Sequence, residues 1–141
     1  GPVRVARLVE RVADLETRLP VRVADGDDIT IRADADQLEQ ALINLIRNAV
    51  DATLEAEGEE VSIRWRKRGG SVHILVEDQG PGVSDTGNLF VPFYTTKQGG
   101  SGIGLVLSRQ IAEGHGGSLE LENREEGGAR ARMILPVDPV A

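Results

Sequence analysis

ADADQLEQALINLIRNAVDAT, residues 33–53, is the stretch on which the predicted fold depends. Asp34 is a good amino-terminal cap for a helix, with Gln37 placed to reach back toward it. Apolar residues then recur at helical spacing, which predicts one buried helix that begins at Asp34 and ends near Glu57-Gly58. The positions of this apolar stripe are Leu38, Ala41, Leu42, Leu45, Ala49 and Ala52.

Two asparagines interrupt the apolar pattern of this helix. Asn44 and Asn48 are four residues apart and therefore lie on one face, which Asp51 continues. A buried amide without a hydrogen-bond partner costs about 1–3 kcal/mol, so these side chains need partners. Two interpretations follow: the amides hold neighbouring loops, or their oxygens face a ligand.

Length and composition are typical of one domain without disulfides. The chain has 141 residues, a formal charge of −7 and no cysteine, which allows a proper core and excludes disulfide or thiolate chemistry. The acidic balance argues against nucleic-acid binding, and no apolar run approaches the ~20 residues of a membrane span. We therefore expect a cytoplasmic domain over residues 20–141 that makes no membrane contact itself. A helix over residues 1–19, which could be the linker from a missing domain, precedes it.

The remaining periodicity predicts an α+β fold. The pattern favours a two-layer sandwich, in which a mixed and mostly antiparallel sheet is covered on one face by three helices. The loop over about residues 83–100 is long for a compact domain and is expected to work as a flexible lid. The other expected elements are a helix over 3–19, a hairpin of 21–24 and 29–32 turning at Asp25-Gly26-Asp27, strands 61–66 and 72–76 turning at Gly69-Gly70, a helix over 101–113, and a hairpin of 118–122 and 129–135.

Two glycine clusters suggest ligand binding. The first is Asp78-Gln79-Gly80-Pro81-Gly82. Its carboxylate only accepts hydrogen bonds and therefore suits an exocyclic amine such as that of adenine. A plain turn is the alternative explanation of the same residues.

The second cluster, the run from Gly99 to Leu105, leads directly into a predicted helix. Small residues there expose backbone N–H groups beside a helix amino terminus, which favours phosphate. A glycine hinge for the lid is the alternative, and both can hold together.

The order of the motifs resembles that of a known family. Asn44-x-x-x-Asn48-Ala49, Asp78-x-Gly80-x-Gly82, Phe90-x-x-Phe93 and Gly100-x-Gly102-x-Gly104-Leu105 are similar to the N box, first glycine box, F box and second glycine box of the GHKL (Bergerat) ATP-binding fold. Within that fold, residues 20–136 resemble the catalytic domain of bacterial two-component sensor histidine kinases. The Asn-Ala-Val-Asp-Ala form looks like the nitrogen-regulation type.

The resemblance implies a role for each matching residue. Asn48 would coordinate Mg²⁺ on the phosphates of ATP, with Asn44 in a supporting polar role, and Asp78 would accept from the adenine amine. Gly80 and Gly82 would let the base sit against the backbone. The phosphates would be wrapped by the second glycine box and the lid, which supply Lys97, Gly100, Ser101, Gly102, Ile103, Gly104 and Leu105. A solvated lysine is the alternative for Lys97.

Two departures from the pattern qualify the expected chemistry. The ATP-hydrolysing relatives of the fold have Glu where this chain has Asn44, so the carboxylate that would activate water is missing and phosphoryl transfer is favoured over hydrolysis. Many histidine kinases have Lys or Arg where this chain has Asp51, which leaves one phosphate contact in doubt. Phe90 and Phe93 are expected to anchor the lid and to meet a helix of the partner domain. Arg47 is expected to lie on the helix surface, and a contact with phosphate is the alternative.

The resemblance also implies partners. The γ-phosphoryl group would go to a histidine on a separate dimerisation domain of the same parent kinase and then to a response-regulator aspartate. His73 and His115 lack the sequence context of an acceptor, so we expect structural roles for both and no self-phosphorylation of this fragment, which we expect to be monomeric. The parent could be anchored in the inner membrane. The alternatives are a serine kinase of the anti-sigma-factor type and a non-catalytic nucleotide-binding regulatory module.

Overall fold

The computed structural model describes residues 1–24, 26–82 and 102–137. The expected lid, with Phe90, Phe93, Lys97, Gly100 and Ser101, lies outside this part of the chain, as does Asp25. The elements in chain order are β1 (Pro2–Arg4), α1 (Val5–Leu15), β2 (Val21–Val23), β3 (Thr30–Arg32), α2 (Ala35–Glu55), β4 (Val61–Arg68), β5 (Ser71–Glu77), α3 (Gly102–Gly114), β6 (Ser118–Asn123) and β7 (Ala129–Pro136).

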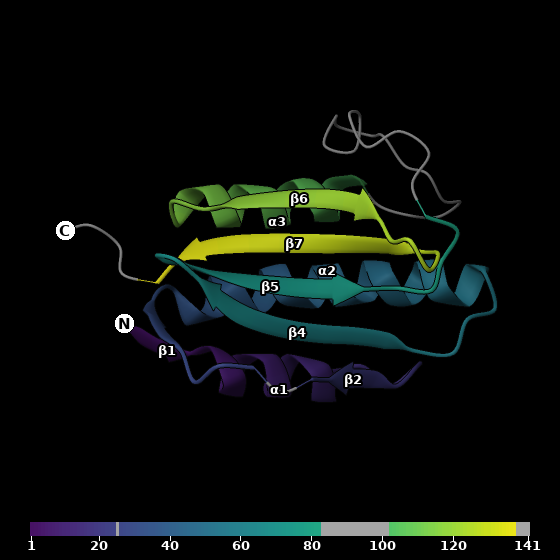
Figure 1. The fold of residues 1–141 in the computed structure, drawn as a ribbon, viewed down its shortest axis with the longest axis horizontal. Coiled ribbons are helices and arrows are strands. Elements are labelled where there is room, and N and C mark those ends of the chain that lie inside the picture. The colour runs from purple at the N-terminus through teal and green to yellow at the C-terminus, as the bar shows by residue number, and fades with distance from the viewer. Residues whose placement is uncertain (25, 83–101, 138–141) are drawn as a thin grey trace.

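The described strands form a small and a large sheet. The large sheet has the order β2-β4-β5-β7-β6, in which β2 and β4 are parallel and the other neighbours antiparallel. Figure 1 shows the helices behind this sheet, so that its other face is open. The arrangement confirms the expected α+β sandwich with a mixed, mostly antiparallel sheet and three helices. It also confirms the strand pairs predicted at β4–β5 and β6–β7.

The central helix forms as its sequence predicts. The N–H of Gln37 donates to Asp34 Oδ1 at 3.0 Å and so caps α2. The apolar stripe of α2 packs into one core with the inward side chains of the large sheet, and α1 joins the same core. The fully buried residues of that core include Val5, Val9, Leu42, Val61, Ile63, Val72 and Met133.

The amino-terminal part differs from the prediction. The helix expected over 3–19 is shorter, because residues 2–4 form β1 and α1 ends at Leu15. The hairpin expected from 21–24 and 29–32 is wrong: β2 pairs with β4, whereas β3 pairs with β1 in a separate two-stranded sheet. The two strands alternate as a hairpin would, but each finds its partner elsewhere in the chain.

Trp65 on β4 explains why the chain does not turn back after β2. Its Nε1–H donates to the carbonyl of Asp27 at 2.7 Å. Gly26 lies so close to the indole that an added Cβ would be 2.4 Å from Trp65 Cε2. The segment after β2 therefore packs against the tryptophan and continues into β3, which pairs with β1, because burial of a large aromatic ring outweighs a local turn.

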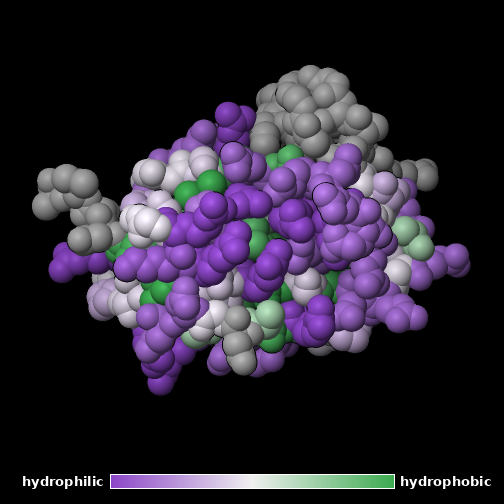
Figure 2. Space-filling model, viewed as in Figure 1, coloured by the Kyte–Doolittle hydropathy of each residue, from purple (hydrophilic) through white to green (hydrophobic). Residues whose placement is uncertain are grey.

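The open face of the large sheet carries polar side chains, and Figure 2 shows that most of it is hydrophilic. Arginines and glutamates alternate across neighbouring strands and pair with one another, as in the Arg130–Glu77 contact at 2.7 Å and the Arg132–Glu122 contact at 2.9 Å. Arg64 also pairs with Glu77, at 3.1 Å. No helix in the described part of the chain is both long and apolar enough to cross a membrane.

Candidate functional site

The amide face of α2 lies beside α3. Asn44 and Asn48 are both half-buried, and Gln40 Nε2 donates to Asn44 Oδ1 at 3.3 Å. Ser108 Oγ on α3 donates to the carbonyl of Ala41 at 3.0 Å in a buried contact. Ala41 is three residues before Asn44 and seven before Asn48, so all three share one side of α2. The helix that follows the second glycine box is thereby held next to the two amides.

The carboxylate of Asp78 is fixed in one orientation. Asp78 is only 7% exposed, and its Oδ1 accepts hydrogen bonds from the N–H groups of Gly80 and Ala129, both at 2.9 Å. The Asp78 N–H donates to the carbonyl of Ala129 at 2.9 Å, and Arg124 Nη1 donates to the carbonyl of Asp78 at 2.6 Å. Two chain segments thus hold this residue by its backbone and by one carboxylate oxygen, which makes it a rigid hydrogen-bond acceptor.

Gly80 has a packing role that the sequence interpretation missed. A Cβ at this position would be 2.7 Å from Ala52 Cβ and 2.8 Å from the carbonyl oxygen of Ala52. The missing side chain therefore lets the loop approach α2. The contact of Gly80 with a planar ligand remains a prediction. Gly82 has a φ of +84°, in the left-handed region that favours glycine. Both glycines shape the loop that carries Asp78.

Two further residues that sequence reasoning missed anchor this loop. Thr53 is fully buried, and its Oγ1 accepts from the N–H of Gln79 at 3.0 Å. The side-chain oxygen of Gln79 in turn accepts from the N–H groups of Glu59 at 2.7 Å and Glu60 at 3.1 Å. A threonine at a buried helical position was the available signal, because a buried hydroxyl requires a partner.

A buried glutamate directly precedes Asp78. Glu77 contacts Arg64 at 3.1 Å, Arg130 at 2.7 Å and Arg124 at 3.6 Å. Burial alone would raise the pKa of Glu77, but the hydrogen bond from Arg130 and the nearby positive charges outweigh it and lower the pKa. The carboxylate therefore stays ionised, and it ties the end of β5 to β4 and β7.

The second glycine box is described only in part. Gly102 is the first residue of α3, and Leu105 is partly buried against the hydrophobic core. The side chains of residues 102–104 lie outside the description, as does the whole of Lys97, Gly100 and Ser101. The structure places α3 beside the amide-bearing part of α2 through Ser108, and it places the loop of Asp78 against Ala52 and Thr53 of the same helix. The roles expected for the site residues, those of the lid included, remain predictions.

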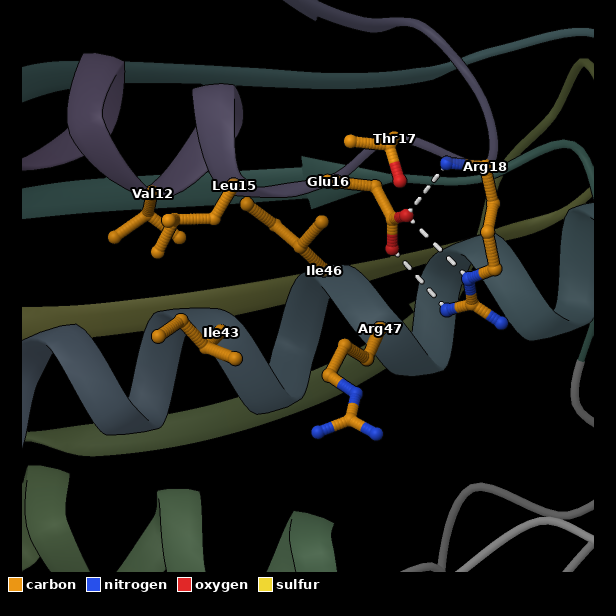
Figure 3. A pocket seen from close by; sticks show the side chains of 8 residues that line it. All are labelled: Val12, Leu15, Glu16, Thr17, Arg18, Ile43, Ile46 and Arg47. Atoms are coloured by element: carbon orange, nitrogen blue, oxygen red, sulfur yellow. Dashed lines mark hydrogen bonds and ion pairs between the residues drawn. The ribbon is translucent and has the colours of Figure 1, made fainter.

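A surface groove of about 510 Å³ lies elsewhere, between α1 and α2. Figure 3 shows Val12 and Leu15 of α1 opposite Ile43 and Ile46 of α2. In the part of the chain that the structure describes, none of the expected nucleotide or metal ligands lines this groove. Arg47 lines it and is exposed, which agrees with its interpretation as a surface residue.

Both histidines contact other protein groups in the structure. His115 Nδ1 lies 2.8 Å from the carbonyl of Ile111, and the N–H of Asp34 donates to His115 Nε2 at 3.0 Å, so the ring joins the end of α3 to the start of α2. His73 lies on the open face, 3.4 Å from Arg132. Burial and the charge of Arg132 lower the pKa of His73. These positions agree with structural roles.

The comparisons with known proteins identify the family. The family described as histidine kinase-, DNA gyrase B-, and HSP90-like ATPase matches residues 33–139, and the chain belongs to it. The chain is 39% identical to the C4-dicarboxylate transport sensor protein DctS of Rhodobacter capsulatus, over 97% of this chain and 20% of that protein. It is 34% identical to sporulation kinase A of Bacillus subtilis, over 94% of this chain and 22% of that protein. The chain thus spans about a fifth of the length of these curated relatives.

Solved structures show which members of this ATPase family the chain resembles in fold. The catalytic domain of the histidine kinase ThkA matches with a TM-score of 0.84 and 30% identity, over 99% of this chain and 96% of that one. The ATP-binding domain of PrrB from Mycobacterium tuberculosis matches with a TM-score of 0.79 and 29% identity, over 99% of this chain and 98% of that one. Over nearly its whole length, the chain is therefore similar to the ATP-binding catalytic domains of sensor histidine kinases.

Proposed function

We propose that this domain binds Mg-ATP and transfers the γ-phosphoryl group to a histidine on a separate dimerisation domain of the same parent kinase. The phosphoryl group then passes to an aspartate of a response regulator. Residues 1–19 lead from the dimerisation domain into the catalytic domain, which is a monomer by itself and works in the cytoplasm. The nitrogen-regulation subtype belongs to the same proposal, since it rests on the Asn-Ala-Val-Asp-Ala sequence alone.

The fixed carboxylate of Asp78 is the observation that carries the proposal. Two N–H groups hold its Oδ1 at 2.9 Å, so the orientation of the whole carboxylate is set before any ligand arrives. A carboxylate is an acceptor only, and it therefore recognises the amine of adenine and discriminates against a base with a carbonyl at that position. This preorganisation suits the recognition of one base.

The amide face of α2 supplies the proposed metal contact. Among the described residues, no group of three or more His, Cys, Asp and Glu could hold a metal ion. The amide oxygen of Asn48 is a suitable hard ligand for Mg²⁺, which usually completes its octahedron with phosphate oxygens and water. Asn44 supports Asn48 and, as an amide, provides no carboxylate to activate water. The bound ion would neutralise charge on the phosphates, while the chain's own residues position the nucleotide.

The lid completes the proposed site. Lys97 contacts phosphate, and Gly100, Ser101, Gly102, Ile103, Gly104 and Leu105 wrap around the phosphates at the amino terminus of α3. Backbone N–H groups at a helix start favour anions, and this supports the assignment.

Replacing Asp78 by asparagine tests the proposal. The Oδ1 of asparagine can still accept from Gly80 and Ala129, so the loop keeps its hydrogen bonds, but an NH₂ group replaces the second oxygen. We expect the Kd for a non-hydrolysable ATP analogue with Mg²⁺ to rise about 100-fold. The carboxylate accepts a charged hydrogen bond from the adenine amine, whereas the NH₂ group of asparagine is a donor and would face the amine, which is also a donor. An inosine triphosphate analogue has a carbonyl at the position of the amine. The substitution should therefore lower the affinity for this analogue far less, or raise it.

The measurement is calorimetric titration, with Asp14→Asn as the matched control. Asp14 is exposed on α1, so this substitution makes the same change of charge away from the site. We expect the control to bind like the unsubstituted chain. Failure of the unsubstituted chain to bind the analogue, or equal binding by Asp78→Asn, would overturn the proposed site.

A further inference from the structure

Arg18 connects the segment after α1 to the last turns of α2. Its Nη1 lies 2.7 Å from Asp51 Oδ1, and its Nη2 lies 3.1 Å from Glu16 Oε1. The backbone N–H of Arg18 also donates to Glu16 Oε2 at 2.9 Å. Figure 3 shows the guanidinium reaching α2 with the Glu16 carboxylate beside it. The arginine is therefore held by its own segment and directed at Asp51.

Arg18 and Glu16 are both charged at neutral pH. The hydrogen bonds with Glu16 and then Asp51 raise the pKa of Arg18. Burial alone would raise the pKa of Glu16, but the hydrogen bonds from Arg18 outweigh it and lower the pKa. Glu16 is thus the orienting partner, and the cation is presented to Asp51.

Helical geometry places Asp51 beside the amide face. Asp51 follows Asn48 by three residues and Asn44 by seven, and at 3.6 residues per turn both offsets return to nearly the same side of α2. A carboxylate in this place repels a polyphosphate, and the net charge of −7 on the chain adds to that repulsion. The binding of a nucleotide next to Asp51 therefore requires compensation.

We propose that Arg18 is a positioning residue that acts through Asp51, offsetting its negative charge and so permitting polyphosphate binding at the amide face. The inference rests on the proposed nucleotide site. It gives the segment between α1 and β2 a part in nucleotide affinity, although none of its residues belongs to the four family motifs.

A purely structural latch between α1 and α2 would predict a different pattern. If the ion pair only held the elements together, Arg18→Gln and Asp51→Asn would do the same damage, since each breaks the same contact. In the electrostatic role, Arg18→Gln weakens binding because the charge of Asp51 is no longer offset, whereas Asp51→Asn removes the repulsion itself. The two substitutions therefore act in opposite directions.

The experiment is calorimetric titration of the whole chain and its variants with AMP-PNP and with ADP, both with Mg²⁺. We expect Arg18→Gln to raise the Kd for AMP-PNP about three- to tenfold, with a smaller effect on ADP, because the effect follows the ligand's charge. Added salt should reduce the difference. Asp51→Asn should bind as tightly as the unsubstituted chain or tighter, and Arg18→Gln/Asp51→Asn should bind within about twofold of it.

Arg11 provides a matched control. It links α1 to α2 through Glu39 at 2.8 Å, so Arg11→Gln removes a comparable ion pair and should leave both Kd values unchanged. Equal weakening by Arg18→Gln and Asp51→Asn would overturn the inference in favour of the latch, and so would an unchanged Kd for Arg18→Gln. Failure of the unsubstituted chain to bind AMP-PNP would instead overturn the nucleotide site on which the inference rests.

Discussion

Replacing Gly80 by alanine would place a methyl group against the backbone of α2. The new Cβ would be 2.7 Å from Ala52 Cβ, 2.8 Å from the Ala52 carbonyl oxygen and 2.9 Å from its carbon. Carbon atoms pack best at about 3.5–4.0 Å, so the loop or the helix must move by several tenths of an ångström or more. Two of the three contacts involve main-chain atoms, which cannot rotate away as a side chain does.

The expected loss of stability is about 1–3 kcal/mol, the usual cost of an added methyl group in a tightly packed region. Backbone strain adds little, because Gly80 is not among the described glycines with positive φ. The displacement also reaches the proposed site, since the Gly80 N–H donates to Asp78 Oδ1 at 2.9 Å. We therefore expect weaker binding of AMP-PNP together with the lower stability.

Urea denaturation followed by circular dichroism measures the free energy of unfolding of Gly80→Ala. Gly70→Ala is the control, because no atom lies within 4 Å of its added Cβ, and its stability should change by less than about 0.5 kcal/mol. Adding Ala52→Gly to Gly80→Ala should cost less than Ala52→Gly costs alone, since it relieves one of the contacts. A Gly80→Ala protein as stable as Gly70→Ala would refute the packing role.

Two further predictions concern the residues that hold the same loop. Thr53→Val should lower the free energy of unfolding by about 1–3 kcal/mol in urea denaturation, because the Gln79 N–H loses its acceptor. Thr53→Ser keeps the hydroxyl and should lose less stability. Equal losses by the two variants would contradict the role of the hydrogen bond. The pKa of Glu77 is lowered from 4.5, so its ion pairs contribute stability above pH 4.5, and this contribution is lost as the pH falls through the lower folded-state pKa. Glu77→Gln should therefore destabilise the chain at pH 7 by about 1–3 kcal/mol. It should also make the free energy of unfolding depend less on pH at acid pH. An unchanged pH dependence would count against the ion pairs of Glu77 with the three arginines.

The sequence predicted the regular elements well where their signals are local. The apolar period of α2 and its Asp34 cap predicted that helix closely, and the alternating residues on both sides of Gly69-Gly70 predicted the β4–β5 pair. The order of the four motifs also predicted the family, since a set of spaced residues is more specific than any single motif. The helix and hairpin signals each lie within a few residues of one another and depend on backbone geometry that every chain shares. The motifs instead predict the family by their order along the chain from Asn44 to Leu105.

Apart from β1 and the end of α1, the sequence determined which of the described segments form helices and strands. It also determined which residues are candidates for nucleotide binding, because periodicity and motif spacing are properties of the chain itself. Only the tertiary structure decided that β2 and β3 join different sheets, that Gly80 packs against Ala52 and that Arg18 reaches Asp51. Each of these contacts joins residues that are far apart in the chain. They depend on the path of the backbone between those residues, and no local pattern records that path.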